Sequence, residues 1–177
     1  MKKDLVTHFI YMLSLFILIA VYKGWLELSY LPFLLGGIFG TFLPDVDYLI
    51  YVYFLKPNEM FSQQVVEFMA NKNFLKGWSL LVENRSQRVG LIFHSALFQV
   101  IFLLFAFLIV TSSGSLLGRG IVLAFSLHLF IDQLVDYMEN KNVDNWFVKF
   151  PFNLDREQKI WFMVGNLFFL FIIAFFF

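Results

Sequence analysis

Five apolar stretches, each close to the length that crosses a bilayer, constrain this chain more than any other feature. A helix needs about 20 apolar residues to span the hydrocarbon core, and it satisfies its own backbone groups there. The predicted spans are Val6–Tyr22, Leu28–Leu43 with a possible extension to Leu55, Val89–Thr111, Leu116–Met138 and Ile160–Phe177. We therefore expect an all-α integral membrane bundle of about five transmembrane helices, with residues 1–177 forming a single domain.

The composition supports this class and excludes others. Hydrophobic residues make up 60% of the chain and charged residues only 15%, against roughly 25% charged in an average soluble domain. The 13 basic and 13 acidic residues cancel, so no overall field favours nucleic acid as a partner. The absence of cysteine excludes disulfides, thiolate metal ligands and a cysteine nucleophile.

The distribution of basic residues predicts the topology. Eleven of the 13 Lys and Arg residues fall at the N-terminus or in the two loops that share its side of the membrane, whereas Lys23 and Arg119 fall on the other side. Basic residues accumulate on the cytoplasmic side. We expect a multi-pass protein of the cell membrane with a cytoplasmic N-terminus and a C-terminus on the opposite side. Lys2 and Lys3 precede an apolar core as in a signal peptide, but no small-residue cleavage site follows, so the first span is read as retained.

Both loops on the cytoplasmic side carry their own pattern. Apolar residues recur at roughly helical spacing in segment 59–81, which predicts one or two helices lying in the membrane interface. Segment 142–161 has aromatic residues suited to the headgroup level, then Asp155 and Gln158 at the spacing of a capping box that opens the last helix. The loops either anchor the bundle or form a lid over a site, and the sequence leaves both readings open.

All three histidines lie inside predicted spans, and His94 would lie about 8 Å inside the third. His128, Asp132 and Asp136 are four residues apart, so they form one polar stripe on a helix. About 12 Å separates His128 from Asp136 along the axis. His128 and Asp132 can therefore bind one ion together, but all three side chains cannot.

The stretch GTFLPDVDYLIYVYF, residues 40–54, places two acids within an apolar run. Asp45 and Asp47 would lie on opposite sides of a continuous helix. Pro44 favours a break after Leu43, and in such a broken backbone both carboxylates can turn toward one place. Just before it, Gly36 and the glycine at position 40 have the GxxxG spacing that lets another helix approach closely.

Placed in alternating spans, the polar side chains converge in the cytoplasmic half of the bundle. They are His8, Asp45, Asp47, His94, His128, Asp132 and Asp136. Mixed imidazole and carboxylate ligands suit zinc, manganese, iron or nickel better than magnesium or calcium. We expect one or two divalent transition-metal ions, zinc first and manganese or iron as alternatives. Each element also has an alternative reading without a metal. A single membrane histidine can be a hydrogen-bonded packing residue, Asp136 can be a solvated carboxylate near a helix end, and the Pro-x-Asp sequence can be an ordinary capped turn.

The order of these motifs resembles the YdjM-like family of predicted membrane-bound metal-dependent hydrolases. The similarity rests on a histidine in the first span, LPDVD after the second, FHSALFQ in the third and HLFIDQL in the fourth. The His-x-x-x-Asp element is also similar to zinc-dependent phospholipase C and P1-type nucleases. The resemblance implies metal ligation by His8, Asp45, Asp47, His94, His128 and Asp132.

The leading hypothesis is a hydrolase that cleaves a phosphate or carboxylic ester of a lipid or lipid-linked substrate at the cytoplasmic face. An acid that stays outside the ligand set would be the general base, and Asp47 and Asp136 are the candidates. Arg85 and Arg88 precede the third span and either clamp a substrate phosphate or anchor the helix by the positive-inside rule. The alternatives are a metal or proton transporter and a non-enzymatic membrane scaffold.

Overall fold

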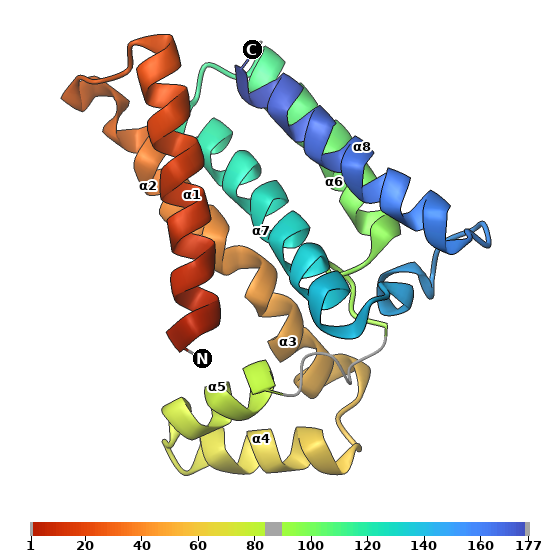
Figure 1. The fold of residues 1–177 in the computed structure, drawn as a ribbon. Helices are drawn as coiled ribbons and strands as arrows, with labels where there is room; N and C mark the ends of the chain where they lie inside the picture. Colours follow the sequence, from red (N-terminus) through yellow and green to blue (C-terminus); the bar gives the residue numbers. More distant parts are fainter. Residues whose placement is uncertain (1, 84–89, 176–177) are drawn as a thin grey trace.

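The computed structural model describes residues 2–83 and 90–175, which form a helical bundle with no strand among them (Figure 1). Its longer helices are α1 (Lys2–Lys23), α2 (Leu31–Phe42), α6 (Ala96–Ser112), α7 (Leu116–Asn140) and α8 (Arg156–Phe175). The predicted all-α class is confirmed.

Within the described residues, four helical segments are long and apolar enough to cross a membrane, namely Leu5–Lys23, Leu28–Leu55, Leu116–Asn140 and Arg156–Phe175. The third predicted span differs. Its helix, α6, begins at Ala96 instead of near residue 89 and has 17 residues, about 25 Å of helix. Ser95 caps it, because the Ser95 hydroxyl accepts a hydrogen bond from the Phe98 amide at 3.3 Å.

The second segment stays helical from Leu28 to Leu55, although its helix type changes along the way. It consists of η1 (Leu28–Tyr30), α2, η2 (Leu43–Asp45), α3 (Val46–Ile50) and η3 (Tyr51–Leu55). The expected break at Pro44 is a single 3₁₀ turn, because the proline occupies the start of η2, where its missing N–H is tolerated. Residues 44–55 therefore continue the second span as helix, and η3 is a π-helical turn.

Glycines bring α2 and α7 into backbone contact. A Cβ atom added to Gly36 would meet the Leu117 carbonyl oxygen, and one added to Gly40 would meet the Ile121 carbonyl. The packing is reciprocal, since a Cβ on Gly120 would meet the carbonyl of residue 33. The close approach predicted from the GxxxG spacing is thus confirmed. It sets the end of α2 directly beside the middle of α7.

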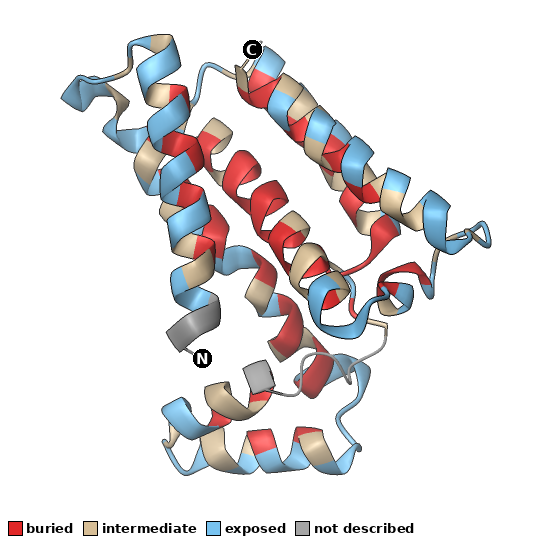
Figure 2. Cartoon of the chain, viewed as in Figure 1, coloured by how far each residue is buried: buried red, intermediate tan, exposed pale blue. Residues whose placement is uncertain are grey.

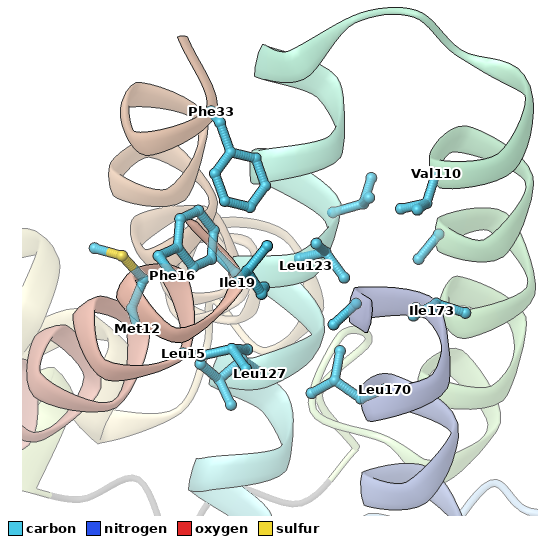
Figure 3. Close-up of a cluster of buried hydrophobic side chains, with 14 of the residues drawn as sticks. Met12, Leu15, Phe16, Ile19, Phe33, Val110, Leu123, Leu127, Leu170 and Ile173 are labelled. Carbon is cyan, nitrogen blue, oxygen red and sulfur yellow. The ribbon is translucent and has the colours of Figure 1, made fainter. Parts of the chain in front are cut away.

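Helix α7 lies at the centre of the bundle and is buried along most of its length (Figure 2). Apolar side chains from α1, α2, α6, α7 and α8 fill the space around its N-terminal half, as Figure 3 shows for Phe16, Phe33, Leu123 and Leu170. By contrast, α1 and α8 expose large apolar side chains on their outer faces, including Ile17 and Phe168. Such faces suit contact with lipid.

Two short helices lie beside the N-terminal end of α1, and α8 ends at the far end of the bundle (Figure 1). They are α4 (Met60–Ala70) and α5 (Phe74–Glu83), so segment 59–81 forms two helices, as predicted.

The second loop packs partly onto the bundle. The 3₁₀ turn η5 (Asp144–Phe147) buries Trp146 and Phe147 against α6, α7 and α8, and the position of the loop's aromatic residues at the headgroup level stays a prediction. The capping box is confirmed: the Gln158 amide donates to Asp155 Oδ1 at 2.8 Å, and the Asp155 amide donates to Gln158 Oε1 at 2.9 Å.

Candidate metal centre

Three histidine side chains converge on one carboxylate, that of Asp132 in α7. Its Oδ1 atom lies 3.1 Å from Nε2 of His8 in α1. Its Oδ2 atom lies 3.1 Å from Nε2 of His94 and 3.4 Å from Nε2 of His128, one helical turn earlier in α7. All four side chains are at least nine-tenths buried. The rings of His8 and His128 stack with their centroids 4.0 Å apart, so the histidines form one compact group.

Asp45 joins this group from η2. Its Oδ1 atom lies 3.6 Å from Nε2 of His128, the ring nitrogen that also approaches Asp132. The potential ligand atoms fall into two overlapping sets whose members lie within 4.8 Å of one another: His8, His128 and Asp132, and Asp45, His94 and His128. Four separate segments of the chain therefore supply the cluster.

In His128 and His94, the ring nitrogen that points away from Asp132, Nδ1, has a polar partner of its own. Nδ1 of His128 lies 2.7 Å from the Thr41 carbonyl oxygen. A carbonyl only accepts hydrogen bonds, so Nδ1 carries the proton and Nε2 of the neutral ring keeps a lone pair. Nδ1 of His94 lies 3.2 Å from Asp47 Oδ2. A carboxylate or carbonyl behind each imidazole is the usual arrangement for histidines that bind metals.

Asp47 is completely buried, yet it belongs to neither set of potential ligands. Its carboxylate accepts hydrogen bonds from three consecutive backbone amides, those of Ile92 at 3.1 Å, Phe93 at 2.6 Å and His94 at 3.1 Å. With the His94 ring added, four donors surround this one side chain. Asp47 thereby fixes the turn that carries His94 and orients the ring, because an ionised carboxylate is a strong acceptor.

Asp136, the third acid of the α7 stripe, also lies outside both sets. Its Oδ2 atom accepts hydrogen bonds from Trp146 Nε1 at 2.7 Å and Asn145 Nδ2 at 3.2 Å. The side chain is 7% exposed, so the solvated carboxylate considered from the sequence is not what the structure has. Asp136 faces a small cavity that it shares with His94 and Asp132.

The donor set fits a transition metal. Ligand atoms that surround a tetrahedral zinc ion at 2.0–2.2 Å lie about 3.3–3.6 Å from one another, and the four contacts around Asp132 and His128 measure 3.1 to 3.6 Å. Nε2 of His128 is buried and makes no hydrogen bond with any of the described residues. Buried histidines and aspartates at these separations can hold a metal ion.

The sequence predicted most of these residues but placed one of them wrongly. His94 lies in the turn before α6, not inside the helix, and the serine that follows it is the cap that could have shown this. Arg85 and Arg88 lie outside the described residues. The sequence analysis missed Thr41, which acts through its carbonyl, and also Asn145 and Trp146. Their position soon after an acid-bearing helix is a weak signal.

Comparison of the chain with known protein families, with curated proteins and with solved structures found no match. The geometry of the cluster is therefore the basis for the functional proposal that follows.

Proposed function

We propose that this protein is a membrane-embedded, metal-dependent hydrolase that cleaves a phosphate or carboxylic ester of a lipid or lipid-linked substrate at the cytoplasmic face. The observation that carries the proposal is the convergence of three buried histidine Nε2 atoms on Asp132. The order of the motifs, which resembles the YdjM-like family, favours hydrolysis among the reactions of such a site.

The metal ligands would be His8, His94, His128, Asp132 and Asp45. A divalent transition metal held there, zinc first with manganese or iron as alternatives, would acidify a nearby water molecule and polarise the ester. Asp47 and the Thr41 carbonyl orient the rings of His94 and His128 so that the Nε2 lone pairs face the cluster.

The depth of the site suits a lipid substrate. His8 lies six residues from the start of α1, and Asp132 lies eight residues from the end of α7. At 1.5 Å per residue these positions are about 9 and 12 Å from the helix ends. The ester linkages of a lipid lie near the membrane surface, at a similar depth. A water-soluble ester would not need a site within helices that are apolar enough to span a membrane.

A transporter would need polar groups that continue from this site across the bundle. Among the described residues, the buried acidic and histidine side chains all belong to the site: His8, Asp47, His94, His128, Asp132 and Asp136. The buried polar residues farther along the helices, such as Gln99, Ser126 and Asn166, are uncharged. Beyond them, the N-terminal half of α7 is surrounded by apolar side chains such as Phe16, Leu123 and Leu170 (Figure 3). Confinement of the buried acids and histidines to one end favours chemistry at a surface over passage of ions through the bundle.

The proposal can be tested by measuring hydrolysis of a panel of lipid phosphates and lipid carboxylic esters by purified, zinc-loaded protein. We expect hydrolysis of one class, with a loss of about 100-fold or more in His128→Ala and Asp132→Ala, because each removes a ligand. Ser126→Ala is the matched control: Ser126 is buried in the same helix, but its hydroxyl donates only to the Val122 carbonyl. Hydrolysis that survives both ligand substitutions would contradict the proposal.

A further inference from the structure

A cavity of about 20 Å³ adjoins the candidate metal centre. Six of the residues that line it are Tyr48, His94, Asp132, Asp136, Asn145 and Trp146. A polar cavity needs about 10–15 Å³ of such space to hold one water molecule. This cavity therefore has room for a single water, and His94 and Asp132 place that water beside the proposed metal ligands.

The loop donates hydrogen bonds to one carboxylate oxygen of Asp136 and not to the other. Both hydrogen bonds from the loop, from Trp146 Nε1 at 2.7 Å and Asn145 Nδ2 at 3.2 Å, end on Oδ2. Oδ1 accepts neither of them. Since Asp136 lines the cavity and both donors end on Oδ2, Oδ1 is the oxygen with capacity left to accept from a water molecule.

The loop that supplies these donors is firmly held. Trp146 is 1% exposed and packs in an apolar cluster with Ala96 of α6, Phe125 and Leu129 of α7, and Met163 of α8. A tryptophan fixed on three helices is a precise donor, because its N–H cannot turn away without disturbing that packing. Asp136 is thus positioned by the rigid part of the second loop.

Asp47, the other candidate base, is already engaged. Its two oxygens accept from three backbone amides and approach the His94 ring, and it does not line the cavity. Of the two acids outside the proposed ligand set, only Asp136 faces the space that can hold a nucleophile.

We propose that this cavity is the nucleophile pocket of the enzyme, in which Asp136 orients the attacking water and Trp146 and Asn145 position Asp136; this rests on the proposed hydrolase function. The water oxygen forms the new bond to the phosphorus or carbonyl carbon of the ester, and the bond to the leaving alcohol breaks. Asp136 takes one proton from the water and passes it to the leaving alkoxide. The carboxylate is thereby regenerated, and atoms and charge balance.

Zinc-loaded variants tested on the ester that the wild type hydrolyses distinguish this role from a structural one. Asp136→Asn removes the base and should lower kcat by about 10²- to 10⁴-fold. Trp146→Phe keeps an aromatic ring but removes the N–H, and it should lower kcat by about 10- to 100-fold through misplacement of the carboxylate. In both variants KM and zinc content should stay at the wild-type level, which a general loss of structure would not allow.

Two further variants complete the test. Asn145→Ala removes the second donor at a half-buried position, so it reports on the same role if Trp146→Phe fails to fold. Asp144→Asn is the matched control, because Asp144 lies in the same turn but is exposed and pairs with Lys159 at 2.7 Å. Its kcat should equal that of the wild type.

Wild-type kcat in Asp136→Asn would overturn the nucleophile pocket and leave the hydrolase standing. Loss of zinc from Asp136→Asn would also overturn it, because Asp136 would then be a ligand. A zinc-loaded wild type that hydrolyses no ester of the panel would overturn the proposed function, and the pocket with it.

Discussion

Nδ1 of His94 lies 3.2 Å from Oδ2 of Asp47, a residue 47 positions earlier in the chain. This contact joins the second helical segment to the turn before α6, and the same carboxylate accepts the backbone amides of residues 92–94. Asp47 thus supports the His94 side chain and its backbone together. A charge buried this deeply is stable only when several donors compensate it, as they do here.

Replacement of Asp47 by asparagine tests this supporting role. The amide cannot accept from all four donors, so we expect zinc affinity to fall by about 10- to 100-fold, the usual cost of removing a residue that orients a ligand. Titration of the metal-free protein with zinc measures it. Glu67→Gln, the same chemical change on the exposed face of α4, should leave the affinity unchanged. Complete loss of binding in Asp47→Asn would instead make Asp47 a ligand.

Replacement of Gly40 by alanine tests the packing that places α2 against α7. The new Cβ would meet the Ile121 carbonyl, and we expect the protein to lose about 1–3 kcal/mol of stability through overpacking. Zinc affinity should fall as well, because the next residue, Thr41, supplies the carbonyl that accepts a hydrogen bond from His128 Nδ1 and orients its ring. Thermal melting in detergent and zinc titration measure the two effects.

The control for this substitution is Gly165→Ala in α8, where an added Cβ meets nothing within 4 Å. That variant should melt at or slightly above the wild-type temperature, since alanine favours helix. Equal melting temperatures for the two variants would show that the contact between α2 and α7 does not depend on small residues.

The sequence predicted the helices and most of the site because these depend on local pattern. Hydropathy predicted the long apolar helices, and the spacing of His128 and Asp132 placed both on one face of α7. The role of Asp47 could not be predicted from local pattern, because it depends on how residues 92–94 fold back over α3. The apolar run before His94 continues the hydropathy of α6 and was therefore read as helix, although the N-cap residue Ser95 marks the start of that helix.

The change at Pro44 shows a second limit of sequence. Pro44, directly before Asp45 and Asp47, predicted a break that turns both carboxylates inward. The chain makes one 3₁₀ turn instead, and this smaller change directs Asp45 toward His128 and Asp47 toward His94. The two acids reach the same histidine cluster but take different positions in it, which spacing alone could not decide.

The predicted topology can be tested with single cysteines, because the chain has none of its own. Cysteines at Lys72, in the turn between α4 and α5, and at Asn142, after α7, should react only with reagents that enter the cytoplasm. A cysteine at Ser113, between α6 and α7, should react from outside. External labelling at Asn142 would invert the orientation and move the site to the opposite surface.

The most direct test of the metal centre is the metal content of the purified protein together with its response to chelator. We predict about one equivalent or more of zinc, manganese or iron, and a lower melting temperature after chelation, since the ligand carboxylates then lack a compensating cation. His128→Ala and Asp132→Ala should lose both the metal and the sensitivity to chelator. Wild-type protein that holds less than about 0.1 equivalents of any transition metal, and whose melting does not change when zinc, manganese or iron is added, would contradict the metal centre.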